Sequence, residues 1–162
     1  LRFMSPTSEN TSMLFLALVA AGTAVAAHMG GSAPLAALLG GILGFERESS
    51  GKSAGLRTHM LVAMGAAMFV TIAQLIGVDA SETSRVIQGV IVGVGFLGAG
   101  AILKSSADGK EQVKGLTTAA GIWFTAAIGV AVGVGKESAA LICTVVALIV
   151  LAVVPVLIRD KK

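Results

Sequence analysis

A short polar segment between two long apolar stretches holds the side chains best suited to chemistry. It runs from Glu46 to Thr58, with Glu46 expected at the C-terminal end of one helix and Arg57 at the start of the next. Each charge opposes its helix macrodipole, so an ion pair between them would relieve both. Gly51 and Gly55 allow the tight backbone that this pairing needs. We predict a fixed Glu46–Arg57 ion pair at the cytoplasmic mouth of a helix bundle; the alternative is a solvated interfacial loop.

A second segment is rich in glycine. Its residues of interest are Gly93, Gly95, Phe96, Gly98 and Gly100, followed by Lys104. The pattern superficially resembles a dinucleotide-binding loop, but no strand precedes it and no βαβ unit surrounds it. Because Gly89, Gly93 and Gly100 share one helix face, we interpret that face as a close helix contact; a thin wall beside a cavity is the alternative. Gln88 is a candidate buried polar residue of the same helix.

A third segment combines small, polar and aromatic residues. It contains Lys114, Gly115, Thr117 and Thr118, and it leads into Trp123. The two threonines can cap the helix that follows, or they can hydrogen-bond across to a neighbouring helix.

The chain shows no motif of a known enzyme class. It has no Ser/His/Asp set, no HExxH and no phosphate-binding loop, so we predict no catalytic residue and no cofactor. His28 and His59 fall at expected helix ends and are expected to be structural or solvated. Cys143 is the only cysteine, and no metal site is predicted. Basic residues are scattered singly, which argues against a nucleic-acid partner.

Composition and charge placement identify the elements that carry these segments. Hydrophobic residues make up 55% of the 162 residues and charged residues only 13%. The charge-free stretches are long enough for membrane-spanning helices, which need about 20 apolar residues. The first stretch is too long for one span and has a natural break at Gly30–Pro34. We therefore predict an all-α, polytopic transmembrane bundle of six helices, at 11–29, 33–46, 57–77, 85–103, 115–134 and 138–158.

Within this organisation, residues 1–10 are expected to form an N-terminal tail and residues 11–162 a single transmembrane domain. The helix at 11–29 is open to three interpretations: a true span, a signal peptide or a re-entrant segment. Glycine pairs at G-x-x-x-G spacing predict close packing of helices in the bilayer. These pairs are Gly40/Gly44, Gly89/Gly93 and Gly129/Gly133.

The distribution of Lys and Arg orients the helices. Two loops, 46–57 and 104–114, and the C-terminus would share one side of the membrane. That side holds Arg47, Lys52, Arg57, Lys104, Lys110, Lys114, Arg159, Lys161 and Lys162, and the other side holds only Arg85 and Lys136. Cytoplasmic loops carry such an excess, so we predict a cytoplasmic C-terminus.

In their order and spacing these segments resemble the MgtC/SapB family of bacterial membrane proteins. The resemblance covers roughly residues 33–158. Beyond Glu46 and Arg57, the matching positions are Arg47, Gly55, Leu56, Thr58, Gln88, Gly93, Gly95, Phe96, Gly98, Gly100, Lys104, Lys114, Gly115, Thr117, Thr118 and Trp123. The chain ends at Lys162 without the soluble C-terminal domain of longer members, and the helix at 11–29 is additional.

The resemblance implies a multi-pass protein of the bacterial inner membrane that is linked to magnesium homeostasis. Some members are described as restraining the F-type ATP synthase. We therefore expect a non-enzymatic protein that lies in the lipid bilayer and regulates another membrane complex. A transporter of Mg²⁺ or a small solute and an oligomeric scaffold, including a homo-oligomer, are the alternatives. The apolar stretches contain no carboxylate, which disfavours a cation pathway.

The predicted topology can be tested by cysteine labelling in a Cys143→Ala background. Single cysteines at Ser50 and Ser106 should resist a membrane-impermeant thiol reagent in intact cells, because both loops are expected in the cytoplasm. Both should react after the membrane is opened. Labelling of either position in intact cells would contradict the orientation.

Overall fold

The computed structural model describes residues 13, 31–107 and 110–154. The chain divides into two compact units, Leu1–Gly31 and Ser32–Lys162. In the first unit only Met13, which is helical and exposed, and Gly31 are described. The predicted tail and the predicted helix at 11–29 therefore fall almost entirely outside the described residues, and the count of six helices stays a prediction.

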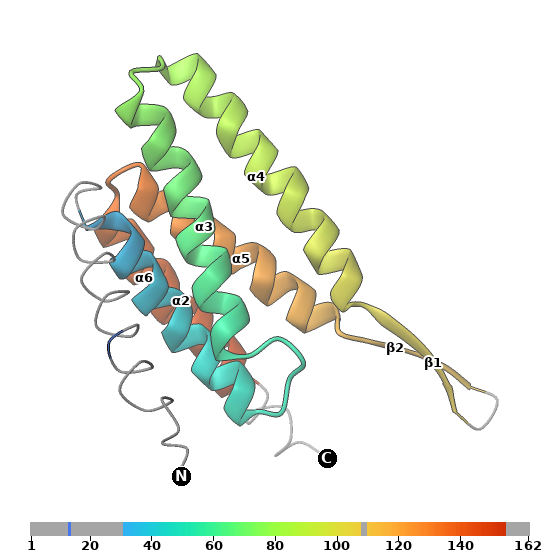
Figure 1. The fold of residues 1–162 in the computed structure, drawn as a ribbon. Coiled ribbons are helices and arrows are strands. Elements are labelled where there is room, and N and C mark those ends of the chain that lie inside the picture. The colour runs from blue at the N-terminus through green and yellow to red at the C-terminus, as the bar shows by residue number, and fades with distance from the viewer. Residues whose placement is uncertain (1–12, 14–30, 108–109, 155–162) are drawn as a thin grey trace, which may run out of the picture. The chain divides into compact units, whose positions relative to one another are not determined.

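The second unit consists of five helices and one hairpin (Figure 1). In chain order they are α2 (Ser32–Ser49), α3 (Leu56–Leu75), α4 (Ala80–Ala101), β1 (Leu103–Ala107), β2 (Lys110–Lys114), α5 (Leu116–Gly133) and α6 (Glu137–Leu148), which continues as a π-helical segment, η1 (Ile149–Val153). Five of the six predicted helices are thus confirmed, with ends shifted by a few residues. Among the described helices, α3, α4 and α5 are each long and apolar enough to cross a membrane.

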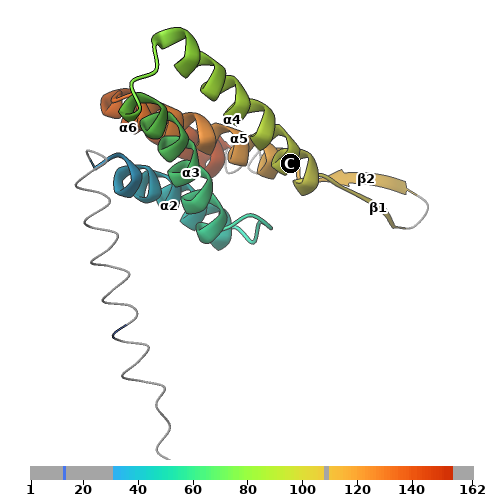
Figure 2. The same ribbon diagram turned by 45° about the horizontal axis from the view of Figure 1, so that its top comes forward.

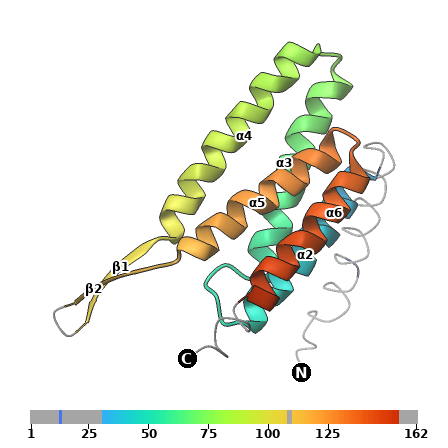
Figure 3. The same cartoon turned by 180° about the vertical axis from the view of Figure 1, so that it is seen from behind.

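The basic segments lie at one end of this unit. The loop after α2, the hairpin and the end of η1 lie together there, while the α3–α4 and α5–α6 turns lie at the opposite end (Figures 1 and 3). This is the grouping that the Lys and Arg distribution predicted. The side of the membrane that each end occupies remains a prediction.

The hairpin corrects the expectation of a plain loop at 104–114. β1 and β2 pair antiparallel in a register that sets Leu103 opposite Lys114 and Ala107 opposite Lys110. This register leaves only two residues between the strands, and the sequence there is Asp-Gly, a dipeptide favoured in two-residue hairpin turns. That dipeptide was the signal in the sequence for a hairpin.

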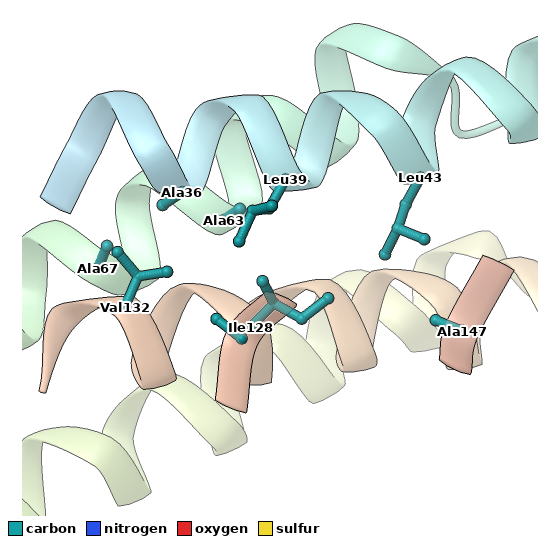
Figure 4. Close-up of a cluster of buried hydrophobic side chains, with 9 residues drawn as sticks. Ala36, Leu39, Leu43, Ala63, Ala67, Ile128, Val132 and Ala147 are labelled. Carbon is teal, nitrogen blue, oxygen red and sulfur yellow. The ribbon is translucent and has the colours of Figure 1, made fainter. Parts of the chain in front are cut away.

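Helix α3 lies at the centre of the packing. It packs against α2, α5 and α4, whereas α4 packs only on α3 and α5 and stands at the margin (Figure 2). The core between α2, α3, α5 and α6 is built mainly from small and aliphatic side chains (Figure 4). Its buried members are Ala36, Leu39, Leu43, Ala63, Ala67, Ile128, Val132, Ala140 and Ala147.

Two of the three glycine pairs bring helices into backbone contact with α3. A Cβ on Gly40 would lie 2.7 Å from the Cβ of Ala63, and one on Gly44 would lie 2.7 Å from the Cα of Leu56. From the other side, a Cβ on Gly133 would lie 2.8 Å from the Ala67 carbonyl oxygen, and Gly129 abuts the backbone of Ala63. Any side chain at these positions would force the helices apart.

The third pair behaves differently, and the expected close contact at Gly93 is wrong for this chain. Gly89 and Gly93 are exposed, and a Cβ on either would have no neighbour within 4 Å. They line an open apolar groove of about 590 Å³ between α3 and α4. The two helices diverge there, so the glycines border a cavity, which was the alternative interpretation of this face.

Substitution of Gly129 should therefore be far more harmful than substitution of a glycine in open space. Gly129→Ala places a Cβ against the α3 backbone, and overpacking of this kind costs about 1–3 kcal/mol. Gly95→Ala is the matched control, because nothing lies within 4 Å of its Cβ position. Thermal unfolding of both variants in detergent measures the difference. Equal melting temperatures would contradict the contact.

Candidate functional site at the Arg47 end of the bundle

Arg47 is the most deeply buried charged residue of the described chain. Its side chain is only 3% exposed, although it stands in the last turn of α2. The guanidinium Nε donates to the carboxylate of Glu46, and Nη2 donates to the carbonyl oxygen of Leu151 at 3.1 Å. Glu46 also accepts a hydrogen bond from the Ser50 hydroxyl at 2.8 Å. The buried cation thus has both a counter-charge and a carbonyl partner.

The Leu151 carbonyl, which accepts this bond, has no α-helical donor of its own. In an α-helix that carbonyl would bond to the N–H four residues further on. Position 155 is a proline, which has no backbone N–H. The Arg47 guanidinium supplies a donor instead, and the bond fastens the end of α2 to the π-helical segment that follows α6.

A second carboxylate holds the start of α3. Glu48 Oε2 accepts the backbone N–H of Leu56, the first residue of α3, at 2.8 Å. A carboxylate at this place satisfies a free N–H and is favoured by the helix macrodipole. Gly55 makes the approach possible, since a Cβ there would lie 3.1 Å from the Cβ of Glu48.

The structure brings Glu46 to Arg47 and not to Arg57. Within the described residues the ion pairs are Glu46–Arg47 and Glu82–Arg85, and Arg57 is exposed. Glu46 and Arg57 do oppose their helix dipoles, but burial decides which arginine pairs with Glu46. A buried guanidinium needs a counter-charge more than an exposed one does. Arg47 matched the family segments, but nothing in the sequence distinguished it from Arg57 as the buried arginine.

His59, which was predicted to be structural or solvated, is buried. Its side chain is fully buried on α3, and Nδ1 lies 3.0 Å from the carbonyl oxygen of Gly55. Gly44 of α2 packs directly over it, since a Cβ there would lie 2.9 Å from the His59 Cβ. The G-x-x-x-G spacing of α2 was the only signal in the sequence that this part of α3 is covered.

The other two motif segments meet where α4 ends and α5 begins. A Cβ on Gly98 would lie 3.7 Å from Ala119, and Gly115 abuts the carbonyl of Ala101 with a positive φ of 94°. Thr118 is buried, whereas its neighbour Thr117 is exposed. The motif residues that are also exposed include Thr58, Gln88, Gly93, Gly95, Phe96, Gly100, Lys114 and Trp123, while Leu56 is half-buried and Lys104 lies on β1.

The Gln88 expectation is therefore wrong, because α4 is the marginal helix and most of its surface faces outward. The segments do not converge on one pocket. They form two junctions at the same end of the unit, one between α2, α3 and η1, the other between α4 and α5.

Removal of the Arg47 charge should destabilise the bundle strongly, whereas removal of the Arg57 charge should not. Arg47→Gln leaves Glu46 uncompensated and weakens the link to η1. We expect a loss of about 2 kcal/mol, less than the roughly 3–5 kcal/mol for a fully buried pair, because the Glu46 side chain is 16% exposed. Arg57→Gln should change stability by no more than about 0.5 kcal/mol. Thermal unfolding in detergent compares them, and similar losses would show that Arg47 is not a structural anchor.

Known proteins match the same part of the chain. SrpB of Synechococcus elongatus is 46% identical over 127 residues, which are 73% of this chain and 70% of that protein. MgtC of Brucella abortus is 47% identical over 119 residues, covering 74% of this chain and 48% of that protein. A protein of Escherichia coli K12 named "Putative magnesium transporter YhiD" is 43% identical over 126 residues, which are 74% of this chain and 57% of that protein.

The matched region thus spans only about half the length of the MgtC and YhiD relatives. No solved structure matches the chain. The family model described as MgtC family matches residues 34–159, a range that takes in both junctions and the five described helices of the second unit, apart from the first two residues of α2. This chain, a multi-pass helical membrane protein, belongs to the MgtC family.

Proposed function

We propose that this chain is a non-enzymatic protein of the bacterial inner membrane that serves adaptation to low magnesium by regulating another membrane complex. The link to magnesium rests on the family and on the name that the YhiD relative carries. The choice of regulation over transport rests on the chemistry of the buried polar groups.

Those groups are of the wrong kind for a magnesium pathway. In the described part of the chain the buried polar residues are Ser32, Arg47, His59, Thr71, Thr118, Thr125 and Thr144. None is a carboxylate, and the described residues contain no group of three or more His, Cys, Asp or Glu that could hold a metal. Magnesium prefers carboxylate and water oxygens in octahedral geometry. The one buried charge among the described residues, Arg47, is a cation and would repel Mg²⁺.

The α3–α4 groove offers a surface for a partner. Its walls are entirely apolar and include three glycines, Gly65, Gly89 and Gly93. Small residues allow the backbone of another transmembrane helix to approach closely. We therefore assign the groove to a helix of the regulated complex.

Gly93→Leu tests this assignment against Val92→Leu. A Cβ at 93 would have no neighbour within 4 Å, and the leucine side chain would extend into the open groove, so the purified variant should melt like the wild type. It should fail to restore growth at low magnesium to a strain that lacks the gene. Val92, which is 75% exposed next to the groove, is the control and should tolerate leucine. Growth that is equal for both variants would remove the groove from the proposal.

Magnesium flux decides between regulation and transport. The purified protein in liposomes should give no more Mg²⁺ uptake than empty liposomes with a fluorescent magnesium indicator inside. Uptake that saturates with Mg²⁺ would establish the transporter alternative instead.

A further inference from the structure

Two buried polar atoms on facing helices have no hydrogen-bond partner among the described residues. They are Nε2 of His59 on α3 and Oγ1 of Thr125 on α5, and both residues are fully buried. An unsatisfied polar group in an apolar interior is costly, so such atoms call for an explanation. Other buried threonines are satisfied: the Thr144 hydroxyl donates to the Ala140 carbonyl at 2.8 Å, and the Thr71 hydroxyl lies 3.1 Å from the Ser32 hydroxyl.

The helix register sets the two residues opposite each other. Gly129 abuts Ala63, and Gly133 abuts Ala67, so α3 and α5 run in the same direction with residues paired at every fourth position. One step earlier in the same series are His59 and Thr125. Side chains on a helix tilt toward its N-terminus, and accordingly the His59 ring extends toward Gly121: a Cβ there would lie 3.5 Å from Nε2.

The hydrogen-bonding roles of the two atoms are also complementary to a single small ligand. The Gly55 carbonyl can only accept, so Nδ1 of His59 carries the hydrogen, and Nε2 of the neutral ring is an acceptor. The Thr125 hydroxyl can both donate and accept. A water molecule can donate to Nε2 while it bonds to the hydroxyl, which gives it the two polar partners that a buried water requires.

Access to the site lies at Gly121. Nε2 itself is buried, and Gly121 places no side chain against it. The same glycine lines a cavity of about 240 Å³ between α2, α5 and α6, together with Leu43, Thr117 and Leu151. We propose that His59 and Thr125 hold one buried water molecule at the interface of α3 and α5, and that this water enters past Gly121.

The water can be detected directly by X-ray radiolysis of the full-length protein in detergent. Hydroxyl radicals formed from a bound water modify the side chains beside it, and mass spectrometry locates the modification. His59 should be modified in the wild type despite its complete burial, and exposed Phe45 serves as the control. Gly121→Ala covers Nε2 at an ordinary contact distance and should abolish modification of His59 but not of Phe45. An unmodified His59 in the wild type would overturn the proposal.

A double-mutant cycle distinguishes the water bridge from a direct hydrogen bond and from independent effects of the two residues. Thr125→Val keeps the shape of the side chain and should lower the melting temperature by several degrees, while Thr125→Ser should restore it. With His59→Phe added, the temperature should fall no further than in the worse single variant. Additive losses would overturn the proposal, and coupling without modification of His59 would replace the water by a direct hydrogen bond. If His59→Phe does not fold, Thr125→Val must still abolish the His59 modification, or the bridge is refuted.

Discussion

The close approach of α2 and α5 to the backbone of α3 is the constraint on which the rest of the structure depends. In a bilayer there is little hydrophobic drive between helices, so packing contacts carry most of the association. Gly40 and Gly44 remove the obstacle on one side of α3, and Gly129 and Gly133 remove it on the other. Because both pairs meet α3 within the span that contains Ala63, the register of all three helices is fixed together. A change at one pair must therefore disturb both interfaces.

The buried polar groups follow from this register. Helix α2 ends where Arg47 can reach the carbonyl that Pro155 leaves without an α-helical donor. Glu46 supplies the counter-charge from the neighbouring position, and Glu48 turns back to hold the first N–H of α3. Without the glycine contacts, α2 would stand further from its neighbours, and these short bonds would be lost. The glycines and the charged residues at this end are thus parts of one arrangement.

The sequence predicted what depends on local pattern and missed what depends on the register between helices. Charge-free stretches predicted α2 to α6 to within a few residues, because apolar length and helix signals are local. The G-x-x-x-G spacing, also a local pattern, predicted the contacts at Gly40/Gly44 and Gly129/Gly133. It erred at Gly93, at Gln88 and over the partner of Glu46, since each of these depends on which helix is central and which is marginal. The hairpin was not predicted: the polar composition of residues 104–114 indicates only a loop, whereas the Asp-Gly dipeptide within it signals a tight turn.

Carboxylates and neutral polar side chains occupy different parts of the described bundle. Carboxylates stay at the ends of the described helices, where they satisfy Arg47 and the first N–H of α3. Apart from Arg47, the buried polar side chains of the described residues are hydroxyls and one imidazole, that of His59 beside Gly121. A continuous path for a divalent cation would need carboxylates along its length, whereas an isolated imidazole and hydroxyl can satisfy each other through one water. The glycine contacts of α2 and α5 with α3 leave little space between these helices. Under the proposed regulatory function, a partner helix would bind to the outer surface, where the Gly89/Gly93 pair of α4 has no neighbour among the described residues.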